Sequence, residues 1–343
     1  MALMTTIEAP QKRRIPALDY TKGTLVLIMV LYHWLNYFVS PEGQIYRYLR
    51  FLTPSFIFIS GFLISHVYFA TYGIGDSRVP KRLMWRGLKI LAVFILLNAV
   101  RTFLIPDSRS GLMPSRFWST QDLMAVYITG NVAVGGSKVA IFPILVPIGY
   151  LLLLSAGLVT IYRRYKYTFH VISLLLLLCN FILGFIGVGY GNLELLTIGL
   201  LGVTFGHIPL EAVSRIVTHR YALTAAYLGY IAAITAWKVV YPVQLAGVFL
   251  NLVLIYVLGV RNGGHGSGRH IVLLGKYSLF GYIAQIAVLQ ALYRGLRPMS
   301  PGAARVAISC IAAFSLTIIC VEVLDRARSR VVAVDRLYKA VFA

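Results

Sequence analysis

Charged residues are scarce in this 343-residue sequence, and the acidic ones are the scarcest. Charged side chains make up 13% of the chain, compared with about 25% in soluble domains. Apolar side chains make up 59%, compared with about 45–50%. Only three cysteines are present, and no cysteine or histidine spacing is typical of a metal site. These shortages exclude a soluble enzyme, a disordered chain and a disulfide-stapled secreted domain. They point to a membrane protein, for which we expect no metal.

Long apolar runs, by contrast, are abundant. A helix needs about 20 residues to cross a bilayer, so ten crossings take about 200 residues and match the apolar fraction. The sequence therefore predicts one all-α domain of about ten transmembrane helices over residues 21–324, with a cytoplasmic tail at 1–20 and a basic cytoplasmic tail at 325–343. The expected spans are Thr21–Val39, Phe51–Tyr72, Leu83–Ile105, Ile141–Tyr162, Phe169–Val188, Leu193–Val213, Ala222–Val240, Val243–Val260, Ile271–Tyr293 and Ala303–Leu324.

Basic residues outnumber acidic ones by 32 to 11, which gives a formal net charge of +21. If the N-terminus is cytoplasmic, 22 of the 32 lysines and arginines fall on the cytoplasmic side of the expected topology. Because basic residues favour cytoplasmic loops, this bias predicts that both termini are cytoplasmic in a bacterial-type inner membrane. This distribution accounts for most of the basicity without nucleic acid, and the partners we expect include membrane lipids.

Ionisable residues in the first expected span are the first candidates for function. Lys22 and His33 are eleven residues apart, about three helical turns, so they share one helix face at a separation of about 16 Å. Asp19 precedes Lys22 by one turn. Charges at membrane depth are costly and often functional, and imidazole exchanges protons near neutral pH. The structural alternative is that Lys22 reaches the headgroups and His33 bonds a neighbouring helix.

More candidates follow in the second span and the loop after it. Ser60 lies beside Gly61, which permits close helix approach, and His66 lies nearer the cytoplasmic end. The stretch SRVPKRLMWRGLKI then adds a basic cluster, which we define as Arg78, Lys81, Arg82, Arg86 and Lys89. Such a cluster serves either as a positive-inside anchor or as a cradle for a phosphorylated cytoplasmic ligand.

Four ordered segments resemble the membrane-bound acyltransferase family 3, within a superfamily that includes periplasmic-glucan succinyltransferases and heparan glucosaminide acetyltransferases. The first is LDYTKGTLVLIMVLYHW, with Asp19, Lys22 and His33, and the second is FIFISGFL, with Ser60. The others, KRLMWRGLKIL and LLGKYSLFGYIAQIAVL, resemble the family's basic third-helix start and a late segment. The resemblance covers residues 14–95 and 272–290. It departs from the family where Lys22 replaces an arginine and Gln285 replaces a histidine.

The resemblance implies transfer of an acetyl- or succinyl-class group from cytoplasmic acyl-coenzyme A to a hydroxyl of a cell-envelope carbohydrate or lipid-linked acceptor. His33 would be the general base or a transient acyl carrier, and Asp19 would hold Lys22 in place. The residues it implies at the donor are Lys22, Lys81, Arg82, Arg86, Ser60 and Gln285. The alternative function is a transporter, or a non-catalytic component of envelope glycan assembly, in which the polar stripe is a substrate path.

Overall fold

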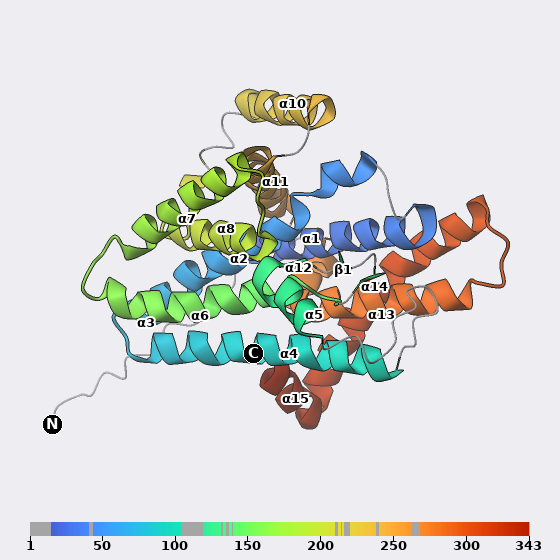
Figure 1. The fold of residues 1–343 in the computed structure, drawn as a ribbon. Helices are drawn as coiled ribbons and strands as arrows, with labels where there is room; N and C mark the ends of the chain where they lie inside the picture. Colours follow the sequence, from blue (N-terminus) through green and yellow to red (C-terminus); the bar gives the residue numbers. More distant parts are fainter. Residues whose placement is uncertain are drawn as a thin grey trace.

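The computed structural model describes residues 15–40, 44–104, 119–131, 133–134, 137–138, 140–209, 212–213, 215, 220–237, 240–262, 266 and 268–342. These residues are almost entirely helical, and the strands among them are two paired two-residue segments, β1 (Ala133–Val134) and β2 (Ser137–Lys138). Together with the many long apolar helices (Figure 1), this confirms the expected all-α polytopic membrane architecture. The cytoplasmic placement of both termini stays a prediction.

Seven helices of the described part are long and apolar enough to cross a membrane, or eight if a bent pair counts as one span. The bent pair is α12 (Gly268–Lys276) and α13 (Ser278–Gly295), which meet at 98°. The seven are α1 (Pro16–Trp34) with η1 (Leu35–Val39), α2 (Leu52–Leu63) with its neighbours η2 (Gln44–Leu49), η3 (Ile64–Phe69) and α3 (Ala70–Tyr72), α4 (Arg78–Leu104), α6 (Leu145–Tyr162), α7 (Thr168–Phe185), α11 (Tyr241–Asn262) and α14 (Ala303–Arg330).

The expected count of ten full spans is corrected at two shorter helices. The expected spans Leu193–Val213 and Ala222–Val240 correspond to α8 (Gly191–Phe205) and α10 (Arg220–Ala236), both shorter than a full crossing. The chain turns after α8 because Pro209 disfavours helical backbone in the residue before it. The apolar run in the sequence is therefore longer than the helix that it forms.

The remaining elements do not cross. Between α4 and α6, the helices α5 (Thr120–Met124) and η5 (Ala125–Thr129) precede the small hairpin. At the other end of the chain, α14 continues to Arg330, past the expected end at Leu324, and α15 (Val332–Phe342) follows directly.

Two groups of helices lie side by side in Figure 1. One group contains α2, α6, α7 and α8, and the other contains α1, α12, α13 and α14. The long α4 packs on α6 and also contacts α15, while α10 lies at the edge of the molecule against α11. The candidate site lies between the two groups.

Glycines set how closely the helices of the first group approach. A Cβ atom on Gly61 would lie 1.9 Å from the carbonyl oxygen of Gly199, and one on Gly202 would lie 2.1 Å from that of Phe58. Apolar surfaces gain little by associating in lipid, so small residues that allow close backbone packing drive helix association there. This contact fixes the turn of α2 that carries Ser60 against α8.

Candidate active site

Two further glycines let α12 lie directly on the first turns of α1. A Cβ atom on Gly275 would lie 1.7 Å from the carbonyl oxygen of Asp19, and one on Gly23 would lie 1.9 Å from that of Ile271. Only backbone-to-backbone contact fits at this crossing. The crossing therefore fixes the end of α12, including Lys276, beside the turn of α1 that carries Asp19.

The two lysines of this region are each paired with a carboxylate. Lys22 Nζ lies 2.5 Å from Oδ1 of the buried Asp19, so the contact expected between these two residues is present. Lys276 Nζ lies 2.8 Å from Asp325 Oδ1, which also accepts a hydrogen bond from the Tyr277 hydroxyl. A charge removed from water needs such a partner. The pairs therefore retain two cations at the junction of α1, α12 and α13.

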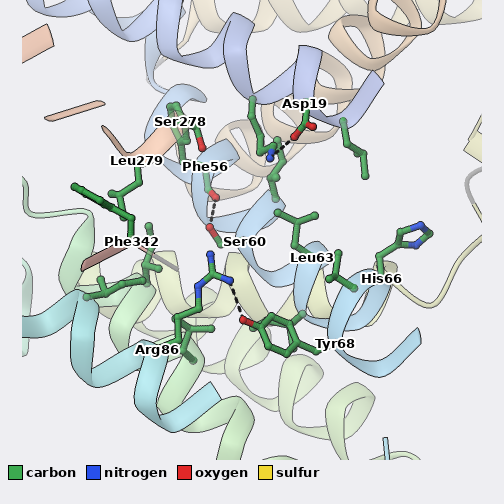
Figure 2. A pocket seen from close by; sticks show the side chains of 18 of the residues that line it. Asp19, Phe56, Ser60, Leu63, His66, Tyr68, Arg86, Ser278, Leu279 and Phe342 are labelled. Carbon is green, nitrogen blue, oxygen red and sulfur yellow. Dashed lines mark hydrogen bonds and ion pairs between the residues drawn. The ribbon is translucent and has the colours of Figure 1, made fainter. Parts of the chain in front are cut away.

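Arg86 differs from these lysines. Its Nη1 atom donates a 2.8 Å hydrogen bond to the Tyr68 hydroxyl, and none of the carboxylates that the structure describes pairs with it. Figure 2 shows its guanidinium between Tyr68 and Ser60. The Ser60 hydroxyl donates to the carbonyl oxygen of Phe56, one turn earlier in α2. Among the described residues, Arg86 therefore has a hydroxyl partner and no carboxylate partner.

A pocket of about 560 Å³ brings these groups together, a volume typical of small-molecule sites. Asp19, Lys22, Ser60, Arg86 and Lys276 contribute its polar wall. The rest of the wall is mainly apolar and comes from α1, α2, η3, α4, α6, α13 and α15. The pocket therefore joins a cationic region to an apolar one, as a ligand with an anionic part and an uncharged part requires.

Tyr282 of α13 marks the apolar end of the pocket. Its ring contacts those of Phe56 and Phe142, at centroid distances of 6.4 and 5.4 Å. Ile148 and Leu152 of α6 also line the pocket. An uncharged acyl or alkyl segment would be buried favourably against these side chains.

Four residues predicted at the site lie outside the pocket lining, namely Lys81, Arg82, His33 and Gln285. Lys81 is exposed, and Arg82 lies over the Tyr72 ring with its guanidinium 4.3 Å from the ring centroid. His33 is half-buried beyond the lining, beside the ring of Tyr32 at 5.1 Å. Tyr32 packs against the same apolar cluster as Tyr282. The pocket does bring together four of the residues predicted from the sequence, namely Asp19, Lys22, Ser60 and Arg86.

Gln285 is the fourth of these residues, and it is completely buried. Neither its Nε2 nor its Oε1 atom has a hydrogen-bond partner in the structure. It shares a face of α13 with Ser278 and Tyr282, both of which line the pocket. An unpaired buried amide is costly, and the structure leaves this one behind the pocket wall, one turn beyond Tyr282.

Arg78, also of the basic cluster, forms contacts with Asp76 outside the pocket. The backbone N–H of Arg78 donates to Asp76 Oδ1 at 2.8 Å, and its guanidinium pairs with Oδ2 at 2.6 Å. These contacts lower the pKa of the Asp76 carboxyl to about 2. Arg78 therefore helps to begin α4, whereas Arg86, two turns later, lies in the pocket.

His66 is a histidine that the pocket does contain. It stacks on Phe62 at 5.2 Å and also lines a second, more open cavity of about 360 Å³ that contains His207. Figure 2 shows its ring directed away from Ser60 and Arg86. Across the described ranges, no three His, Cys, Asp or Glu side chains gather closely enough to hold a metal ion.

Sequence reasoning missed three features of the pocket wall. Lys276 lies in the LLGKYS stretch, where its position beside Gly275 could have indicated it. Tyr338 and Phe342 come from α15, whose amphipathic pattern predicts a membrane-surface segment and gives no sign of a pocket. Tyr68 is a single aromatic in an apolar run, and we find no sequence signal for it.

Comparison with known proteins gives one match. Residues 14–109, less than a third of the chain, match the family described as heparan-alpha-glucosaminide N-acetyltransferase, catalytic. No curated protein and no solved structure matches. The matched region contains Asp19, Lys22, His33, Ser60 and Arg86. It supports a relation to membrane acetyltransferases and does not single out acyltransferase family 3.

Proposed function

We propose that this protein is an integral-membrane acyltransferase that uses acyl-coenzyme A as donor and a carbohydrate or lipid-linked carbohydrate as acceptor. The observation that carries the proposal is that Lys22, Arg86 and Lys276 line one pocket, in which they adjoin an apolar end. The similarity of residues 14–109 to an acetyltransferase catalytic region supports the same activity. We further propose an inner-membrane location with the donor on the cytoplasmic side, as the distribution of basic residues favours.

The cationic region suits the phosphates of the donor. Arginine binds phosphate through two parallel hydrogen bonds, which a lysine does not provide. Because Lys22 and Lys276 are already paired with Asp19 and Asp325, Arg86 has the largest unused capacity for an anion. The acyl segment would then extend toward Tyr282 and the apolar residues of α6.

Acyl transfer also requires a general base that removes the proton of the acceptor hydroxyl or amine. In our proposal, imidazole of His33 takes the proton from the acceptor hydroxyl or amine while the acceptor oxygen or nitrogen forms a bond to the acyl carbon. The carbon–sulfur bond breaks, and the departing thiolate takes up a proton as coenzyme A thiol. If His33 instead carries the acyl group, its ring nitrogen forms the first bond and the acceptor displaces it in a second step.

Release of free thiol tests the reaction directly. Purified protein in detergent is incubated with acetyl- and succinyl-coenzyme A and with sugars that offer either a hydroxyl or an amine, and products are identified by mass spectrometry. We expect thiol release that depends on the acceptor. Solute counterflow in vesicles without thiol release would instead establish the transporter.

Arg86→Ala should weaken donor binding by about 10- to 100-fold, since a hydrogen bond to a charged group is worth about 1.5–3 kcal/mol. The measurement is KM for acyl-coenzyme A together with direct calorimetric binding. Arg82→Ala, one turn earlier on α4, removes the same charge outside the pocket and should cost much less. Equal losses in the two variants would contradict the assignment of Arg86 and favour a diffuse electrostatic effect.

A further inference from the structure

The last helix, α15, folds back onto the protein and completes the pocket. Tyr338 and Phe342 line the pocket, and Val341 packs against the main apolar cluster. In Figure 1, α15 lies beside α4 and follows α14 closely. Its opposite side is uncovered, since Val332 and Leu337 are each 67% exposed. The helix therefore has one face in the site and one face outside it.

Arg328 at the end of α14 holds α15 in this position. Its Nε and Nη2 atoms lie 3.0 and 2.5 Å from Asp335 Oδ1, and its guanidinium lies over the Tyr338 ring, 3.9 Å from the centroid. Lys339 and Arg328 together hold the pKa of the Asp335 carboxyl below its ordinary value, so the contact is complete at neutral pH. The docking of α15 is thus built from specific contacts in addition to apolar ones.

Of the two aromatic rings of α15 that line the pocket, Phe342 is the better placed to contact a ligand. Tyr338 is covered by the Arg328 guanidinium on one side and contacts Tyr277 edge-on at 5.3 Å. Phe342 contacts Tyr338 at 5.0 Å and Phe280 at 6.2 Å. Figure 2 shows Phe342 beside Leu279 at the pocket wall. An aromatic ring so placed, in a pocket that also contains three cations, suits a flat heterocycle attached to phosphate groups.

We infer that α15 forms the nucleotide-recognition wall of the donor pocket, with Phe342 stacking on the adenine base and Arg328 positioning the helix. The inference rests on the proposed function, because it takes coenzyme A as the donor. Stacking of a nucleobase on an aromatic side chain is worth about 5- to 150-fold in affinity by alanine substitution. Arg328 is a positioning residue, since it does not line the pocket.

The test compares coenzyme A with pantetheine, which has the same thiol arm and no nucleotide. Binding of both to the full-length protein in detergent is measured by calorimetry. We expect Phe342→Ala to weaken coenzyme A binding about 10-fold or more and to leave pantetheine binding unchanged. Phe342→Trp should retain coenzyme A binding, while Phe342→Leu, which keeps an apolar side chain without the ring, should not. Arg328→Ala should resemble Phe342→Ala.

Leu337→Ala is the matched control, because Leu337 is the residue next to Tyr338 on the uncovered face of α15. It should bind coenzyme A as the wild type does. Wild-type affinity in Phe342→Ala, or equal losses for coenzyme A and pantetheine, would overturn the role of α15 and leave the acyltransferase standing. A wild-type protein that binds no coenzyme A would overturn the proposed function, and this inference with it.

Discussion

His33→Ala should lower kcat for acyl transfer by about 100- to 10,000-fold, the usual contribution of a positioned general base. KM for the donor should change little, because His33 lies outside the lining of the pocket that we propose for the donor. It stands eleven residues beyond Lys22 on the continuous helix α1, so both side chains lie on one face about 16 Å apart. In the proposed mechanism, that separation leaves room for the thioester between the phosphates of the donor and the base.

His170→Ala is the control for His33→Ala. His170 is an exposed histidine of α7 that lines neither cavity, and its replacement should leave the rate unchanged. His66→Ala decides between the two candidate imidazoles, since His66 is the one that lines the pocket. Retained activity in His33→Ala with loss of activity in His66→Ala would refute the assignment of His33 and would make His66 of η3 the general base.

Gly275→Ala should destabilise the protein by at least about 3 kcal/mol, the upper end of ordinary overpacking costs. The added Cβ would lie 1.7 Å from the carbonyl oxygen of Asp19, a backbone atom that cannot turn aside. Helix α12 would have to move away from α1, which would displace Lys276 from the pocket. We therefore expect a lower unfolding temperature in detergent and loss of donor binding in the same variant.

Gly157→Ala is the control for Gly275→Ala, because it makes the same substitution in a helix at an uncrowded position. Gly157 lies within α6, and a Cβ atom there meets nothing within 4 Å. Alanine favours helix by up to about 1 kcal/mol over glycine, so this variant should be as stable as the wild type or more stable. An unfolding temperature for Gly275→Ala equal to that of Gly157→Ala would show that α12 does not pack on α1 as described.

The first helix shows how much of the site the sequence could predict. The spacing of Asp19, Lys22 and His33 placed them on one face of a helix, and the structure has that helix and the ion pair. The sequence did not show which basic residues near the start of the third expected span contribute to the site. Lys81, Arg82 and Arg86 look alike as a basic cluster in the sequence. At about 100° per residue, Lys81 lies about 140° away from Arg86 around the helix axis, whereas Arg82 lies on nearly the same face but about 6 Å, one turn, earlier. Of the three, Arg86 is the one that lines the pocket.

The ninth expected span is sharply bent in the structure, which the sequence did not indicate. Residues 271–293 form an apolar run long enough to cross, yet the chain bends by 98° between α12 and α13. Hydropathy measures how well a segment dissolves in lipid and carries no information about its direction. The bend is held by contacts with other segments, including the hydrogen bonds of Lys276 and Tyr277 to Asp325 on α14.

By itself, the sequence determined the membrane environment, the helical class and the polar face of α1, since composition and residue spacing act locally along the chain. Only the tertiary structure decided which cations share the pocket, how α12 and α13 bend, and that α15 closes the site. Those features depend on which helix faces meet. The crossing of Gly23 with Ile271, and of Gly275 with Asp19, joins segments far apart in the chain, and no local pattern specifies such a contact.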